Sequence, residues 1–313
     1  MPNAPTETEV LSWFDTLSNW GRWGSDDQLG TMNHISPAAR TAAAGLVRDG
    51  TTVSCAWDID TVPRVDHIAG PAQRFMLATG EPALPPGVRG GGAMEYIGLA
   101  YHGYTVTHID GLSHVFWDGH MYNGRPAAQV TAWAGALSQP ITALSAGVVT
   151  RGVLLDVATD GGGDWLEPGT GVYPEQLEAA EARQGVKVGA GDVVLLRTGY
   201  GRLVRERGHY NVRADGRAGW HPAWLPWLHE RGVAAIAGDT ACGCMPNPGY
   251  PSIHDPVHAI GIVAMGLWLI DNCDLEALAV ECADRNRYEF LFMLSPLRVV
   301  GGTGSPVNPL AVF

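Results

Sequence analysis

Asp192-Val-Val-Leu-Leu-Arg197 is a run of four apolar residues with a charged residue at each end. Two similar runs are Gly152-Val-Leu-Leu-Asp156 and Val233-Ala-Ala-Ile-Ala237. None of the three alternates apolar with polar residues, as a strand with one solvated face would. We therefore expect three strands that are buried on both faces of a sheet.

Helix signals separate these strands. Residues 174–183 and 222–231 each begin with a proline, and Gly232 follows the second segment. Residues 37–47 follow Ser36, a good N-cap, and also begin with proline. Further strands are predicted at residues 51–57, 288–294 and 297–300. The alternation predicts an α/β fold with some parallel pairing, and we expect a single domain over residues 1–313.

Composition narrows the class of protein. The chain has 313 residues, of which 46% are hydrophobic, as is typical of a soluble globular protein. A net charge of -12 argues against nucleic acid or an anionic membrane surface as a partner. The five cysteines include no CxxC pair, the N-terminal residues are acidic, and the longest apolar run, residues 259–270, is too short to span a bilayer. We expect a cytoplasmic protein, and this composition says little about a small-molecule substrate.

The segment from Tyr101 to His114, YHGYTVTHIDGLSH, concentrates groups that bind metals. His102, His108, Asp110 and His114 all occupy even positions. Because side chains two apart in an extended backbone point the same way, His108 and Asp110 should lie roughly 6–7 Å apart at the backbone. Imidazole and carboxylate ligands suit a shared divalent cation. His114, beyond a glycine, is either a further ligand or a proton-transfer group.

A second cluster lies far along the chain. His254-Asp-Pro-Val-His258 precedes the apolar segment 259–270, and Asp271 follows it. If residues 259–265 are helical, His258 lies at the start of that helix and Asp271 at the end of the next strand. Side chains at element ends can reach a common pocket, so these two residues are candidate ligands. An equally supported interpretation makes His258 a helix-start residue and Asp271 a cap of the next helix.

The chain resembles the metal-dependent cyclase-family hydrolases, which include bacterial kynurenine formamidase and isatin hydrolase. Thr107–His114 (THIDGLSH) matches the second half of their signature, His-x-Gly-Thr-His-x-Asp-x-x-x-His. The longer members of the family are also similar at residues 20–30 (WGRWGSDDQLG), 116–124 (FWDGHMYNG), 256–258 (PVH) and 301–309 (GGTGSPVNP). The resemblance spans nearly the whole chain.

The resemblance implies a swivelling β/β/α fold, a mixed sheet with flanking helices, and a homodimer or homotetramer. It also implies one or two Zn or Mn ions per site. The residues that it assigns are His108 and Asp110 as motif ligands, His114 as the proton-transfer group, and His258 and Asp271 as the distal ligand pair. Where the family has its first motif histidine, this chain has Tyr104. Its nearest replacements are His102 and the Tyr104 phenol.

The chemistry that fits is attack of metal-activated water on a cyclic or aryl amide, a lactam or a lactone, with His114 carrying the proton. Aromatic side chains are expected to contact an aromatic or cyclic substrate: Trp20, Trp23, Tyr104, Phe116 and Trp117. Two alternatives stay open. One is a lyase, a cyclase or dehydratase of natural-product metabolism on the same scaffold. The other is a binding protein that has lost its metal.

Overall fold

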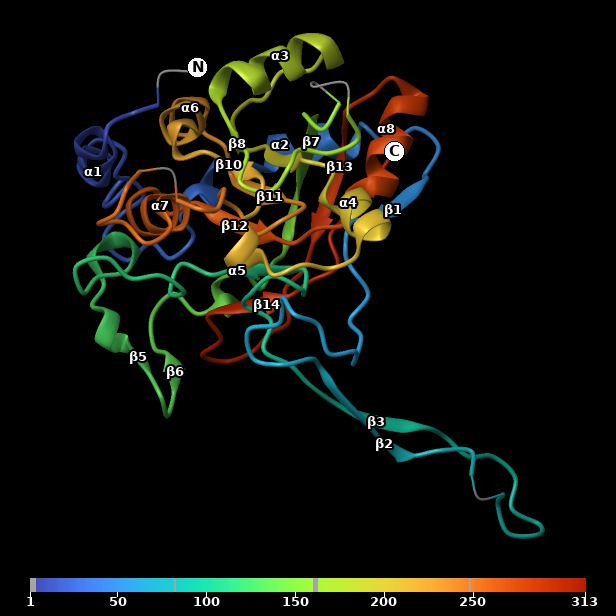
Figure 1. Cartoon of the computed structure of the whole chain (residues 1–313). Helices are drawn as coiled ribbons and strands as arrows, with labels where there is room; N and C mark the ends of the chain where they lie inside the picture. Colours follow the sequence, from blue (N-terminus) through green and yellow to red (C-terminus); the bar gives the residue numbers. More distant parts are fainter. Residues whose placement is uncertain (1–3, 82, 160–162, 248) are drawn as a thin grey trace.

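The computed structural model describes residues 4–81, 83–159, 163–247 and 249–313, so parts of the predicted domain (residues 1–3, 82, 160–162 and 248) lie outside the described residues. Its centre is a nine-stranded sheet (Figure 1). The strand order is β1 (Thr52–Ser54), β15 (Leu310–Val312), β13 (Glu289–Leu294), β7 (Val148–Asp156), β9 (Val193–Arg197), β11 (Ala235–Gly238), β12 (Trp268–Asp271), β4 (His108–Asp110) and β14 (Gly304–Pro306).

Both kinds of strand pairing occur in this sheet. The central strands β7, β9, β11 and β12 pair in parallel. The strands on either side pair antiparallel. Every residue of β9 and β11 is buried, and so are residues 152–155 of β7, which agrees with the prediction from these three apolar runs. The predicted α/β architecture, a mixed sheet with flanking helices, is confirmed.

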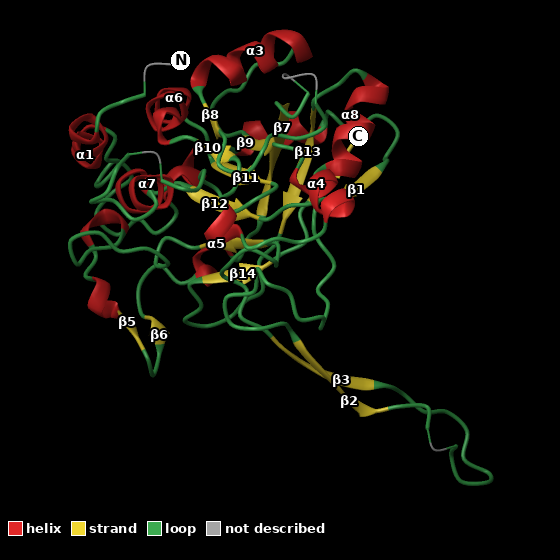
Figure 2. Cartoon of the chain, in the orientation of Figure 1, coloured by secondary structure: helices red, strands yellow, loops and turns green. Residues whose placement is uncertain are grey.

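Helices flank the sheet, and several occupy the connections between parallel strands (Figure 2). α2 (Pro37–Ala44) begins as predicted, because the Ser36 side chain accepts a hydrogen bond from the Ala39 N–H at 3.1 Å. Among the described residues, no helix is both long and apolar enough to cross a membrane. The other helical segments are α1 (Glu7–Thr16), η1 (Gly30–His34), η2 (Tyr122–Gly124), η3 (Ala127–Gln129), η4 (Ile141–Leu144), α3 (Pro174–Gln184), α4 (Tyr200–Arg207), α5 (Val212–Asp215), η5 (Pro222–Trp224), α6 (Leu225–Arg231), α7 (Pro256–His258), the π-helical η6 (Ala259–Met265) and α8 (Glu276–Arg285).

Two strand predictions need correction. Residues 297–300 form no strand, and Val300 is 89% exposed. The Leu297 N–H donates instead to the Ser305 side chain at 2.8 Å, and the strand that follows is β14. The strand predicted at residues 51–57 shortens to β1, because its partner β15 offers only three residues for pairing.

A hairpin projects away from the body of the molecule (Figure 1). It consists of β2 (Gln73–Ala78) and β3 (Met94–Gly98), and we call residues 72–99 the arm. Its strands carry apolar side chains that are between 44% and 61% exposed: Phe75, Met76, Leu77, Met94, Tyr96 and Ile97. Two further small pairs are β5 (Val130–Thr131) with β6 (Gly135–Ala136), and β8 (Gly171–Val172) with β10 (Gly219–Trp220).

A buried histidine after β10 makes stability depend on pH. His221 is fully buried, its Nδ1 accepts from the Ala223 N–H at 3.1 Å, and its Nε2 has no hydrogen-bond partner among the described residues. Burial lowers the pKa of His221 to about 4. In the unfolded chain a histidine has a pKa of about 6.5. The unfolded state therefore takes up this proton first as the pH falls, and stability is lost between these two values.

The variant His221→Asn isolates this effect, because asparagine can still accept from the Ala223 N–H but does not titrate. Between pH 7 and pH 4.5, the wild type is expected to lose roughly 2–3 kcal/mol more unfolding free energy than the variant. Urea unfolding of both proteins at the two pH values measures this difference. Equal losses in the two proteins would contradict it.

Candidate metal centre

Three elements and one loop bring the predicted ligands together. β4 carries His108 and Asp110, and it pairs antiparallel with β12, so that Asp271 lies opposite His108. His258 is the last residue of α7, and His102 lies in the loop before β4. All five residues line one pocket. The two sequence clusters therefore meet in space.

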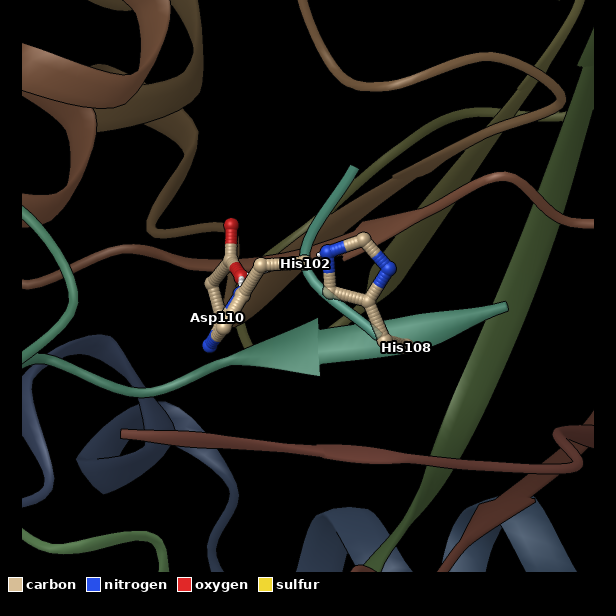
Figure 3. A group of neighbouring side chains, drawn as sticks. All are labelled: His102, His108 and Asp110. Carbon is tan, nitrogen blue, oxygen red and sulfur yellow. Dashed lines mark ion pairs between the residues drawn. The ribbon is translucent and has the colours of Figure 1, made fainter. Parts of the chain in front are cut away.

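The first group of ligand atoms comes from His102, His108 and Asp110 (Figure 3). His102 Nδ1 lies 2.8 Å from Asp110 Oδ1, and His108 Nε2 lies 3.4 Å from the same oxygen. We call these three residues the first triad. The three candidate ligand atoms lie within 4.8 Å of one another, which is close enough for one cation to contact all three.

The second group comes from Asp110, His258 and Asp271, and we call it the second triad. His258 Nε2 lies 3.6 Å from Asp110 Oδ2 and 3.3 Å from Asp271 Oδ2. The two oxygens of Asp110 thus face different triads. The Asp110 carboxylate is shared between them.

Several buried nitrogen and oxygen atoms in the triads have lone pairs that could bind a cation. Apart from the contacts with histidines of the site, both carboxylate oxygens of Asp110 and Nδ1 of His102 have no hydrogen-bond partner among the described residues. His108 Nδ1 lies 2.8 Å from Val106 O, and a carbonyl oxygen can only accept a hydrogen bond. In the neutral ring Nδ1 therefore carries the proton, and Nε2 keeps a free lone pair. The Cys242 N–H donates to Asp271 Oδ1 at 2.8 Å, which leaves Oδ2 directed at the site. This set of nitrogen and oxygen donors fits a divalent cation.

Electrostatics leads to the same conclusion. Burial opposes charge on His258, but Asp255 and Asp271 raise its pKa well above the ordinary value. Burial also opposes charge on Asp110, yet the histidines around it, His114 foremost, hold its pKa well below the ordinary value. The buried carboxylates are therefore stabilised by a nearby positive charge, either a protonated imidazole or a metal cation.

His114 lies beside the first triad without belonging to it. Its ring stacks on His102 with centroids 3.8 Å apart, and its Nε2 lies 3.8 Å from Asp110 Oδ1. The side chain keeps 28% of its surface exposed and lines the pocket. Burial lowers the pKa of His114 to about 4, so the imidazole is neutral at neutral pH and able to accept a proton.

The pocket in front of the triads has a volume of about 580 Å³. Tyr104, Phe116 and Trp117 line it, as the sequence predicts for substrate contacts. Ile68, Val115 and Ala259 add apolar wall. A neighbouring pocket of about 460 Å³ shares several wall residues with it: Tyr104, Arg217, Ser252, His254 and Asp255.

Trp20 and Trp23 do not reach this pocket. The Trp20 indole N–H donates to Val263 O at 2.6 Å, and the ring lines a separate small pocket. Trp23 packs edge-on against His34, with ring centroids 5.2 Å apart. The structure therefore places both of these predicted substrate contacts elsewhere.

The predicted extended backbone holds for only part of the histidine-rich segment. Only residues 108–110 form a strand, so alternation places His108 and Asp110 alone. His102 reaches Asp110 through a series of bends, and His114 through the turn after Gly111. His102 contributes the third candidate ligand atom of the first triad. The guanidinium carbon of Arg217 lies over the Tyr104 ring, 5.3 Å from the ring centroid.

Two charged residues of the pocket wall, Arg217 and Asp255, are absent from the sequence-based predictions. The Asp255-Pro256 pair, an N-cap followed by proline, signals the start of α7 and places Asp255 beside His258. Arg217 belongs to no motif. Its contacts are to Ala241, Gly243 and Asp255, more than twenty residues away in the sequence.

Comparisons with known proteins agree with this geometry. A family model described as putative cyclase matches residues 31–242. One solved structure, described as a novel cyclase, is 33% identical, covers 95% of this chain and 99% of its own, and has a TM-score of 0.84. Isatin hydrolase A from Ralstonia solanacearum (19% identity, 88% and 96% coverage, TM-score 0.59) and from Labrenzia aggregata (20%, 86% and 94%, 0.58) share the fold. None of the curated proteins matches the sequence significantly.

Proposed function

The chain belongs to the putative cyclase family, and on this basis we propose that it is a metal-dependent hydrolase that opens a cyclic or aryl amide, or a lactone. The predicted cyclase-family fold is confirmed by the structural match over 95% of the chain. The observation that carries the proposal is the pair of triads sharing Asp110, with His114 beside them in one pocket.

The ligand set would be His102, His108, Asp110, His258 and Asp271. A divalent cation held there, Zn or Mn, would lower the pKa of a water molecule and polarise the substrate carbonyl. His114 accepts the proton of the attacking water, because its imidazole is neutral at neutral pH. It then returns this proton to the leaving nitrogen or oxygen. The His102 ring, stacked on His114, holds the imidazole in place during both transfers.

The aromatic lining of the pocket supports a small, flat substrate, aromatic or cyclic. Phe116 and Trp117 line the pocket that contains the triads. Trp117 is fixed by a stack on Phe14, with centroids 4.1 Å apart, whereas Phe116 is 45% exposed. An aromatic ring held between such side chains would place its carbonyl toward the triads.

A lyase remains a second candidate, because Tyr104 and His114 line the same pocket and could move protons during ring closure or dehydration. To separate the two functions, the protein loaded with Zn or Mn is incubated with cyclic amides, lactones and aryl formamides in ¹⁸O-labelled water. Hydrolysis must place solvent oxygen in the product. Conversion without label would overturn the hydrolase proposal in favour of the lyase. Binding of these compounds without any conversion would indicate a binding protein.

The expected homodimer or homotetramer and the cytoplasmic location are also proposals. All five cysteines are free, which supports a reducing compartment. The arm supports self-association. A two-stranded hairpin is only marginally stable alone, and a second chain packed against the arm would bury its exposed apolar side chains.

Replacing residues 74–97 by a short Gly-Ser linker is expected to convert the oligomer to a monomer. The apolar side chains of the arm would then have no partner chain to pack against. Light scattering after size exclusion measures the mass of each protein. A wild type that is already monomeric, or a shortened protein of unchanged oligomeric state, would contradict this role of the arm.

A further inference from the structure

The imidazole of His258 has contacts on both sides. Its Nε2 faces the second triad, and its Nδ1 lies 3.0 Å from Asp255 Oδ1. The other oxygen of that carboxylate, Oδ2, lies 3.1 Å from Nη2 of Arg217. A continuous row of charged groups thus leads from the candidate ligand to a buried guanidinium.

Arg217 is held firmly in this row. It is 2% exposed, and its Nε donates to Ala241 O at 3.0 Å and to Gly243 O at 2.7 Å. Its backbone also exchanges two hydrogen bonds with Met245. The guanidinium therefore cannot turn away from Asp255 without leaving buried partners unpaired.

The loop that anchors Arg217 also orients Asp271, another member of the second triad. In this loop, the Cys242 N–H donates to Asp271 Oδ1 at 2.8 Å. Gly243 has φ +125°, and a Cβ there would lie only 3.0 Å from Asp255 Oδ1. The positive φ favours glycine at this position, and the missing Cβ leaves room for the carboxylate. This accounts for the glycine in the Cys242-Gly-Cys244 sequence, which the hydrolytic chemistry leaves unused.

The backbone of Asp255 gives a separate reason to assign it a role. Asp255 has φ +83°, a left-handed conformation that is uncommon outside glycine, although aspartate adopts it more readily than most residues. Such conformations persist where the surrounding structure enforces them, and they cluster at functional sites. Here the backbone turn brings the carboxylate to its contact with the His258 imidazole.

We propose that Asp255, held by Arg217, is a positioning residue that orients the His258 imidazole and sets the affinity of the second triad for its cation. This rests on the metal site of the proposed function. A carboxylate beside the outer nitrogen of a ligating histidine fixes the ring and its tautomer and makes the inner nitrogen a better donor. The first triad has no contact with Asp255 and keeps its affinity.

The test is a calorimetric titration of metal-free protein with Mn²⁺, comparing the wild type with Asp255→Asn. Asparagine keeps the size of the side chain and one acceptor oxygen but removes the charge. One of the two Mn²⁺ affinities is expected to fall about 10- to 100-fold, and the other to stay within about threefold. If the wild type binds a single Mn²⁺, that affinity is the one expected to fall.

Two further variants sharpen the test. Arg217→Lys keeps the charge but not the fork of donors, so the same affinity should fall by a smaller factor. Asp156→Asn removes a similarly part-buried carboxylate, 3.0 Å from Arg197 and three strands from β12. This control should lower the unfolding temperature and leave Mn²⁺ binding unchanged.

The outcomes separate the two proposals. If Asp255→Asn and Arg217→Lys bind Mn²⁺ as the wild type does, the positioning role is overturned and the proposed function stands. If both Mn²⁺ affinities fall together, the assignment to the second triad is wrong. A wild type that binds neither Mn²⁺ nor Zn²⁺ would overturn the proposed function and this inference with it.

Discussion

Replacing Asp110 by alanine is expected to remove every bound cation and to lower kcat/KM by at least about a thousandfold. The reason is that Asp110 gives one oxygen to each triad. Without this side chain, the first triad keeps only its two histidines, and the second triad keeps only His258 and Asp271. Neither remainder offers three ligand atoms, so both positions weaken together.

Elemental analysis of the purified proteins measures the first part of this prediction. The wild type should contain about one or two Zn or Mn ions per chain, as the family resemblance implies, and Asp110→Ala close to none. Asp192→Ala is the matched control, because Asp192 is equally buried but pairs with Arg151 near the start of β9, away from both triads. It should lose stability and keep its metal. A metal-free wild type that stays inactive after Zn or Mn is added back would refute the hydrolase proposal.

Replacing His114 by glutamine is expected to lower kcat about 10²- to 10⁴-fold, while metal content and KM change little. Glutamine fills similar space and forms hydrogen bonds, but it cannot accept the proton of the attacking water. His114 belongs to neither triad, so the ligand atoms remain in place.

His120→Gln is the control for this prediction. His120 lies on the same stretch of chain but is exposed, and it does not line the pocket of the triads. Its substitution should leave kcat unchanged. Steady-state kinetics with metal analysis of all three proteins decides the question. If His114→Gln keeps most of its kcat, the proton carrier is another group, and Tyr104, which lines the same pocket, is the first to test.

The central sheet could be predicted from the sequence because strands buried on both faces leave continuous apolar runs, as in β9 and β11. The end of the sheet at β14 could not. Residues 297–300 have the composition of a strand, but a strand needs a free edge, and β14 occupies the edge beside β4. Whether an edge is free depends on distant parts of the chain. The single domain over residues 1–313 stays a prediction.

The candidate ligands were found because each motif puts its groups close together in sequence. The aromatic side chains were harder, since tryptophan is equally suited to packing. Trp117 lies in the pocket, whereas Trp20 and Trp23 are used elsewhere. Arg217 was missed because its partners are backbone carbonyls and a distant carboxylate, and such contacts leave no local pattern.

The shortness of β4 restricts how the length of this chain can change. β4 has only three residues and pairs on both sides, with β12 and with β14. One residue inserted between His108 and Asp110, or deletion of the residue between them, would put these two side chains on opposite faces of the sheet. The arm is free of this restriction, because its ends return to the body where Ile68 packs against Gly103. Related proteins should therefore vary in length at the arm and keep the spacing from residue 108 to residue 110 unchanged.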